Sequence, residues 1–125
     1  MRILLAVVAL TLLAGCSSPD APTTPDQPQN GSSEMKMVSM IDNSFKDANF
    51  DRIPGGQAMY MNQGQNPHTV TIHLVGEPAT TLKVDETLQP DQTKTYTFAT
   101  AGTYHVFCKF HGTMTSGMSS TVTVG

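Results

Sequence analysis

The segment CKFHGTMTSGM, residues 108–118, places one thiol, one imidazole and two thioethers close together near the C-terminus. The spacing of Cys108 and His111 allows a single loop to bring a thiolate and an imidazole to one point. A second histidine and a weak methionine ligand would complete the His₂Cys set that is diagnostic of type 1 copper sites. The segment therefore predicts part of a copper site and requires a histidine from elsewhere in the chain.

Four histidines are available, and their positions on the expected strands separate them. Residues 68–75, HTVTIHLV, alternate in the pattern of a half-buried strand rich in β-branched side chains. His68 begins this strand on the face expected to point inward, whereas His73 lies on the opposite face and is expected to be solvated. His105 alternates out of register with the cysteine and is also expected to face away. His68 and His111 are therefore the histidines that an inward metal ion could collect.

Two stretches carry a resemblance to a known family. GTYHVFCKFH, residues 102–111, followed by a glycine–methionine pair and a V-x-V strand, resembles the C-terminal copper loop of the cupredoxins, the plastocyanin and amicyanin group. PGGQAMYMNQGQNPHTV, residues 54–70, resembles the family's other signature, in which a strand and an asparagine precede the loop that delivers the first histidine. The resemblance implies a Greek-key β-sandwich, one copper ion near one end, and one-electron transfer. It also implies the copper ligands, which would be His68, Cys108, His111 and one methionine.

The identity of that methionine is where the sequence departs from the family pattern. Amicyanin-like loops place the methionine three residues after the second histidine, which would select Met114. Plastocyanin-like loops place it five residues after, and that position here is Ser116. In the family the methionine also precedes the first inward aliphatic residue of the last strand by four residues, and Met118 stands four residues before Val122. We favour Met118 as the axial ligand and keep Met114 as the alternative.

The globular part of the chain is expected to be all-β. The chain has ten glycines and eight prolines, and no stretch shows a sustained helical period of apolar residues. Short alternating segments separated by turn signals predict a sandwich or barrel of seven or so strands. The family resemblance implies that this is a Greek-key β-sandwich or barrel of about seven to eight strands. The residues expected to contact the core between the clearest strands are Phe45, Phe50, Ile53, Leu82, Val84 and Leu88.

The N-terminal region is expected to serve export rather than the fold. Residues 1–16, MRILLAVVALTLLAGC, combine a charged start, a short apolar run and small residues, which is typical of a signal peptide. LAGC resembles the bacterial lipobox, which implies cleavage before Cys16 and lipidation of its thiol. The following residues carry four prolines and little that is apolar, as in a flexible tether. The predicted organisation is a signal peptide (1–15), a lipidated cysteine with a flexible linker (16–34), and a copper-binding domain (35–125).

These features together predict a tethered electron carrier. The net charge of −3 comes without a basic stripe, which argues against nucleic acid as a partner. The resemblance implies one type 1 copper ion that shuttles single electrons between redox protein partners. We expect a monomer that is not an enzyme, held by its lipid on the extracytoplasmic face of a bacterial membrane.

Three other functions were weighed against this one. Copper delivery or storage would use the methionines, but these fall at strand positions and are expected mostly to fill the core. An enzyme with Cys108 as nucleophile and His111 as base lacks a residue to orient the histidine. A β-sandwich binding module without metal would leave the cysteine and the histidines unexplained. The methionines concerned in the first alternative are Met35, Met37, Met40, Met59, Met61 and Met114.

Overall fold

The computed structural model describes residues 34–125, which fold into nine β-strands and, within that range, no helix. The strands are β1 (Lys36–Ile41), β2 (Ser44–Lys46), β3 (Phe50–Arg52), β4 (Gly56–Asn62), β5 (His68–Leu74), β6 (Val84–Leu88), β7 (Thr93–Phe98), β8 (Gly102–Thr113) and β9 (Ser116–Val124). The all-β prediction is confirmed. The count exceeds the predicted seven to eight because two three-residue strands, β2 and β3, form in a segment expected to be polar turns.

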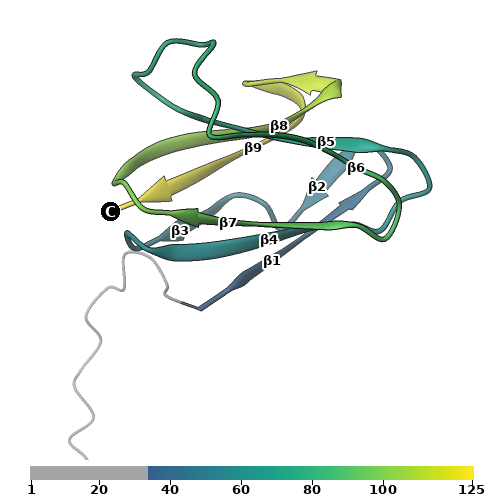
Figure 1. Ribbon diagram of the computed structural model, residues 1–125, viewed down its shortest axis with the longest axis horizontal. Helices are drawn as coiled ribbons and strands as arrows, with labels where there is room; N and C mark the ends of the chain where they lie inside the picture. Colours follow the sequence, from purple (N-terminus) through teal and green to yellow (C-terminus); the bar gives the residue numbers. More distant parts are fainter. Residues whose placement is uncertain (1–33) are drawn as a thin grey trace, which may run out of the picture.

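The strands make two sheets that face each other as layers of a sandwich (Figure 1). One sheet has the order β2-β1-β4-β7, and the other has the order β3-β9-β8-β5-β6. The pairs β1–β4 and β3–β9 are parallel, whereas the remaining pairs are antiparallel. Parallel neighbours require connections that leave the sheet and return, so the chain passes repeatedly between layers, as the predicted cupredoxin-like sandwich demands.

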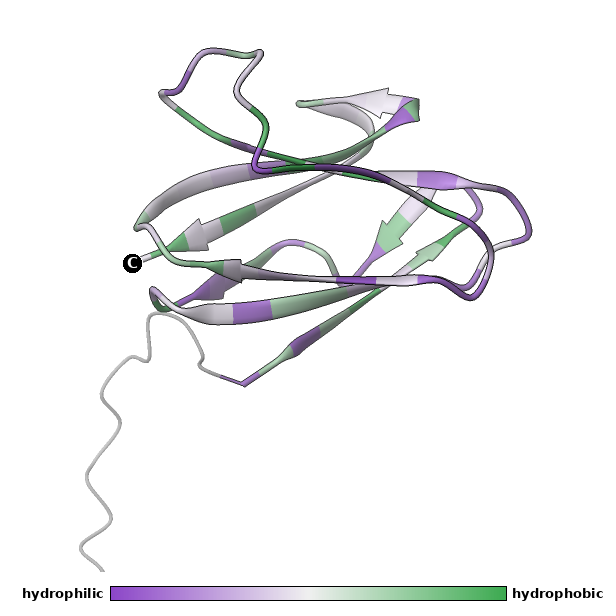
Figure 2. Cartoon of the chain, in the orientation of Figure 1, coloured by the Kyte–Doolittle hydropathy of each residue, from purple (hydrophilic) through white to green (hydrophobic). Residues whose placement is uncertain are grey.

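The core fills the space between the two sheets. Along the C-terminal part of β9, hydrophobic residues alternate with serine and threonine, which Figure 2 shows as green and pale segments. Tyr60, Phe98 and Tyr104 are the largest fully buried side chains, and the rings of Phe98 and Tyr104 meet edge to face with centroids 5.0 Å apart. The Tyr104 hydroxyl donates to the Thr100 carbonyl at 2.8 Å, which satisfies its polar end.

Among the predicted core residues, the structure corrects two, Ile53 and the half-buried Leu82, neither of which belongs to the core cluster. Val84 and Leu88 are buried, and Phe45 and Phe50 pack against the core from its margin. Ile53 is 38% exposed, because it stands at the turn before β4, where its carbonyl accepts a hydrogen bond from the Gly56 N–H at 2.9 Å. Turn chemistry, rather than hydrophobicity, decides its position.

The prediction that the methionines mostly fill the core is wrong. Met40 is fully buried, but Met35 and Met37 are 45% and 51% exposed. Met59 and Met61 are half-buried on β4. Alternation places Val38 and Met40 of β1 inward, so the neighbouring methionines point to the outer face of the sheet, which no other strand of residues 34–125 covers.

The predicted signal peptide, Cys16 and all but the last residue of the predicted linker lie outside the described residues. No helix within residues 34–125 is both long and apolar enough to cross a membrane. β1 begins and β9 ends near one end of the sandwich, and the β8–β9 hairpin lies toward the other end (Figure 1).

Candidate metal centre

Three donor atoms meet at the end of the sandwich that carries the β8–β9 hairpin. His68, Cys108 and His111 each offer one ligand atom, and these atoms all lie within 4.8 Å of one another. The two histidine Nδ1 atoms are 3.2 Å apart, and the Cys108 Sγ lies 3.8 Å from His68 Nδ1 and 3.6 Å from His111 Nδ1. We call these three residues the donor cluster. The sequence-based selection of two histidines from four therefore matches the residues that the fold brings together.

These separations fit a single metal ion. Bonds of about 2.0–2.1 Å to nitrogen and about 2.3 Å to sulfur, at angles of about 100–120°, put neighbouring donor atoms about 3.1–3.8 Å apart. The three measured distances fall in this interval. Two imidazoles and one thiolate leave room for a weak axial group, and this donor set suits copper.

A bulge in the β8–β9 ladder delivers two of the donors. β8 runs through Cys108 and His111 and ends at Thr113, so both donors come from a strand and not from a loop. Its pairing with β9 changes register between Phe107, which pairs with Ser119, and Gly112, which pairs with Gly117. The residues 108–111 therefore lie opposite Met118 alone. Such bulges re-aim side chains away from the regular alternation, which is how a cysteine and a histidine three residues apart can face one point.

Two glycines allow the hairpin strands to approach closely beside this bulge. A Cβ on Gly112 would lie 2.6 Å from the Met118 backbone nitrogen, and one on Gly117 would lie 2.5 Å from the His111 carbonyl oxygen. Gly117 also has φ of 70°, a conformation that side-chain-bearing residues rarely adopt. These positions hold the backbone of the His111 segment against the segment of Met118.

Asn62 fixes the loop that leads to His68. Its side-chain amide donates to the carbonyls of Asn66 at 2.8 Å and Leu88 at 2.9 Å, and its Oδ1 accepts from the Gly64 N–H at 3.0 Å. Asn62 is fully buried, and His68 is only 1% exposed. The asparagine noted in the motif of residues 54–70 thus ties β4, the loop and β6 together, so that His68 starts β5 in a defined position.

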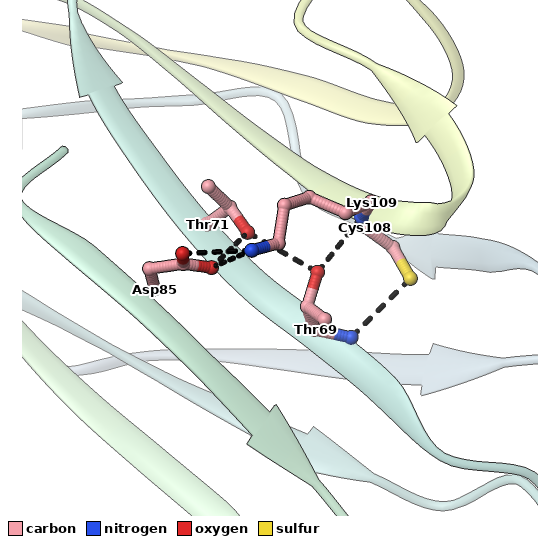
Figure 3. A network of polar contacts seen from close by, with 5 residues as sticks. All are labelled: Thr69, Thr71, Asp85, Cys108 and Lys109. Carbon is pink, nitrogen blue, oxygen red and sulfur yellow. Dashed lines mark hydrogen bonds and ion pairs between the residues drawn. The ribbon is translucent and has the colours of Figure 1, made fainter. Parts of the chain in front are cut away.

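A polar network reaches the Cys108 sulfur from the outer side of the sheet (Figure 3). The Thr69 N–H donates to Cys108 Sγ at 3.3 Å, and Thr69 Oγ1 accepts from the Lys109 N–H at 2.8 Å. Thr69 also contacts Thr71, whose hydroxyl donates to Asp85 at 3.3 Å. The Lys109 ammonium pairs with Asp85 at 2.6 Å. Sequence reasoning missed this network, although the outward alternation of Thr69 and Thr71 beside a predicted ligand was a usable signal.

The surroundings of His68 favour its neutral form. Burial lowers the pKa of His68 below its usual value, and the neighbouring His111 lowers it further, while Asp42 acts weakly in the opposite direction. The rings of His68 and His111 lie 5.0 Å apart between centroids. A neutral imidazole is the metal-binding form, so this environment keeps the nitrogen available at neutral pH.

The two candidate axial methionines occupy different positions. Met118 is 1% exposed and belongs to the same buried cluster as Cys108. Met114 is half-buried and begins the two-residue turn between β8 and β9, beyond the Thr113–Ser116 pair. The buried methionine is therefore the one that faces the 108–111 bulge.

The remaining two histidines form a pair on the outer face of the five-stranded sheet. His73 and His105 are direct partners across β5 and β8, so they point away from the core as predicted. His73 is nevertheless only 6% exposed, and the prediction that it is solvated is wrong. The loop after β5 turns back over this face (Figure 1), and the Glu77 carbonyl lies 3.2 Å from His73 Nε2. A loop, not a strand, covers this histidine.

Comparison with known proteins places the chain in a family. The model of the cupredoxin-like domain matches residues 4–124. Comparison with curated protein sequences finds no significant match. Among solved structures, a dithionite-reduced auracyanin from Roseiflexus castenholzii matches with a TM-score of 0.60 and 20% identity over 76% of this chain and 98% of that one.

Two further solved structures show the same fold. A purple cupredoxin from Nitrosopumilus maritimus matches with a TM-score of 0.58 and 17% identity, covering 72% of this chain and 99% of that one. The amicyanin from Paracoccus versutus matches with a TM-score of 0.58 and 25% identity, covering 80% of this chain and 86% of that one. Because the family model spans nearly the whole sequence and the donor cluster fits one copper ion, the chain belongs to the cupredoxin-like family.

Proposed function

We propose that this chain is a type 1 copper electron carrier whose ion is held by His68, Cys108 and His111, with Met118 as the weak axial ligand. The observation that carries the proposal is the assembly of two imidazole nitrogens and one thiol sulfur at metal-ligand separations. Copper bound there supplies a one-electron couple between Cu(I) and Cu(II). The protein's own contribution is to hold the donors in one arrangement for both oxidation states.

That rigidity has an identifiable origin. The strands that carry the donors, β5 and β8, pair in one sheet. The Asn62 hydrogen bonds hold the loop before His68, and the Thr69 hydrogen bonds link β5 to β8 beside Cys108. Donors that are already in place need little rearrangement when an electron arrives or leaves. The hydrogen bond from Thr69 to the Cys108 sulfur also stabilises electron density on the thiolate, which tunes the reduction potential.

Met118 is proposed as the axial ligand because it alone opposes the 108–111 bulge across the ladder. It is fully enclosed, so its thioether has no competing contact with water. Met114 lies at the hairpin turn, beyond the Thr113–Ser116 pair, and is not opposite the bulge. The register argument made from the last strand and the bulge in the ladder therefore favour the same residue.

Electrons would enter and leave through His111. Its ring is half-buried, and its neighbour Phe110 is 55% exposed, with the two ring centroids 6.4 Å apart. An exposed aromatic ring beside a metal ligand offers a partner a close, uncharged approach. The nearby Lys109 is neutralised by its ion pair with Asp85, which keeps a strong local charge away from this approach.

Export and membrane tethering are part of the proposal. They are supported by the signal-like residues 1–16 and the lipobox-like segment that ends at Cys16. The start of β1 lies at the end of the sandwich away from the donor cluster (Figure 1). A tether attached there would leave His111 free to meet redox protein partners, and a domain held on a linker meets them at a raised effective concentration.

Addition of Cu(II) to the purified protein tests the proposal. We expect one equivalent to bind and to produce the intense visible thiolate-to-copper absorption of blue copper proteins. Stopped-flow mixing of the reduced and oxidised forms with small redox reagents should then show rapid, reversible single-electron exchange. A colourless copper complex, or a site that takes up zinc but not copper, would contradict the assignment.

Copper delivery or storage remains the second candidate, and one observation favours it. The methionines were expected mostly to fill the core, which argued against copper delivery. Because Met35 and Met37 are exposed, that argument no longer holds. A transfer titration distinguishes the two functions, because an electron carrier keeps its ion when the reduced protein is mixed with a Cu(I) chelator at equal concentration.

A further inference from the structure

Four methionines gather on the outer surface of the sandwich, on the sheet that does not carry the donor cluster. Three come from outward positions of the parallel pair β1–β4 and the fourth, Met35, directly precedes β1; we call them the methionine face: Met35, Met37, Met59 and Met61. Met37 is 51% exposed, and the two β4 members are half-buried. None of them belongs to the hydrophobic core.

The strand register brings three of these side chains within reach of one point. Met37 is the direct partner of Met59, and Met61 follows on the same face of β4, beside Ser39. Strands lie about 4.8 Å apart and alternate residues on one face about 6.7 Å apart, so the three Cβ atoms form a small triangle. Methionine has three rotatable bonds before its methyl group, enough for three sulfurs to converge above that triangle.

A hollow already exists at this place. It has a volume of about 110 Å³ and is lined by Met37, Val38, Ser39, Met61 and Gln63. Two of the methionines, Met37 and Met61, line this hollow, and Met59 is not among its lining residues. The Ser39 hydroxyl donates a hydrogen bond to Gln63 Oε1 between two of the lining residues. The hollow gives an ion access from solvent without any movement of the sheet.

The apolar character of the face is confined to the methionines. On β7, Thr93 pairs with Met61 and Thr95 pairs with Met59, and both threonines are exposed. On β2, Lys46 pairs with Ser39. No aliphatic or aromatic side chain at these paired positions extends the patch. A surface evolved for apolar docking would continue onto β7, whereas this one concentrates sulfur on two strands.

We propose that the methionine face binds one Cu(I) ion through the thioethers of Met37, Met59 and Met61. Thioethers are soft, neutral donors that select Cu(I), and the flanking groups are hydroxyls and an ammonium rather than carboxylates or imidazoles. Zn²⁺ and Cu(II) therefore find no carboxylate or imidazole at these paired positions of the described strands. Met35 stands one alternate position before Met37 and can supply a fourth thioether. This site is separate from the donor cluster and goes beyond the proposed electron-carrier function.

An anaerobic Cu(I) titration of the full chain tests the site. The protein is first loaded with one equivalent of Cu(II), reduced with ascorbate, and then titrated with further Cu(I) in competition with bicinchoninate. We expect a second Cu(I) to bind, and to pass to the chelator at lower chelator concentrations than the first. X-ray absorption at the copper edge should show added sulfur scattering from the second equivalent, with no added nitrogen. A titration that ends after the first equivalent would overturn the proposal.

Isosteric variants separate sulfur chemistry from simple apolarity. The triple substitution M37L M59L M61L keeps the volume and hydrophobicity of the face and removes its sulfurs. We expect this variant to bind one Cu(I) per chain instead of two and to keep the absorption spectrum of the oxidised protein. The matched control M114L, which removes a half-buried methionine outside the face, should retain the second ion. Unchanged stoichiometry in the triple variant would show that the second ion binds elsewhere.

The test of the methionine face can succeed or fail independently of the test of the proposed electron-carrier function. If the donor cluster failed to form a blue centre, the absence of visible absorption with Cu(II) would reveal it. The difference of one Cu(I) between the native chain and the triple leucine variant would still be measurable in that case, because the variant leaves His68, Cys108 and His111 unaltered.

Discussion

The donor cluster and the methionine face both present sulfur to solvent-borne copper, but in opposite surroundings. Cys108 and Met118 are enclosed between the sheets, and hydrogen bonds fix the segments that carry the cluster. Met37 and Met59 stand on the outside of a sheet with no described segment above them. One region has a fixed geometry before any ion arrives, whereas the other must gather flexible side chains around it.

This difference predicts different chemistry from related ligands. Enclosed donors cannot rearrange, so they accept both oxidation states in one geometry and release the ion slowly. Exposed thioethers pay an ordering cost on binding and remain open to chelators and protein partners. The same chain can therefore combine a retained redox centre with a surface that takes up Cu(I) and gives it away.

Cys108→Ser should have the largest effect, because it removes the thiolate on which the visible absorption depends. We expect complete loss of the blue colour with Cu(II) and retention of the Cu(I) ion on the methionine face. Absorption spectroscopy and the chelator competition measure the two outcomes on the same sample. Loss of both ions would show that the two regions are not independent.

Met118→Gln should alter both the spectrum and the potential of the donor cluster. A harder oxygen donor favours Cu(II), so the reduction potential should fall. The buried amide should also destabilise the fold by about 1–3 kcal/mol. The matched change Met114→Gln, at the hairpin turn, should leave the spectrum unaltered and change stability by less than about 0.5 kcal/mol. The reverse pattern in voltammetry would identify Met114 as the axial ligand.

Thr69→Val should weaken the frame that holds the cysteine. The Lys109 N–H would lose its 2.8 Å acceptor. An unsatisfied group of this kind costs about 1–3 kcal/mol, measurable by urea unfolding of the apo-protein. We expect a shifted reduction potential and unchanged Cu(I) binding at the methionine face. Thr71→Val is the control, because it leaves both contacts of Thr69 with Cys108 and Lys109 in place; an equal effect of the two changes would contradict this role.

Acidification should affect the donor cluster and spare the methionine face. The pKa of His68 is lower in the folded chain than in the unfolded one, because burial and His111 oppose its charge. The unfolded chain therefore binds more protons, and the stability of the apo-protein should fall as the pH drops below about 6.5, by at most about 1.4 kcal/mol per pH unit.

Urea unfolding of the apo-protein between about pH 7 and 5 measures this slope, because that range spans the ordinary titration of histidine. His68→Gln should flatten the slope and thereby serve as the control. Thioethers do not titrate in this range, so binding of Cu(I) by the methionine face should stay constant once the chelator's own pH dependence is subtracted. A parallel loss at both regions would indicate that histidine contributes to the second site.

The sequence by itself determined the chemistry of the donor cluster. The Cys108–His111 spacing indicated two donors, and the alternation of residues 68–75 favoured His68 over His73 as the third. These deductions succeeded because a strand has a period of two, so the sequence reports which side chains share a face. The last-strand register likewise pointed to Met118, which the ladder places opposite the bulge at residues 108–111.

Only the tertiary structure decided which of those faces is covered. The alternation of side chains assigns Met37 and Met59 to one face of their sheet. It does not show whether that face is covered or exposed to solvent. His73 points to the outer face of its sheet and is still buried, because the loop after β5 folds across it. The link from Thr69 to Lys109 also joins residues forty positions apart. Coverage and cross-chain contacts arise from how the layers and loops stack, and a period of two carries no information about that.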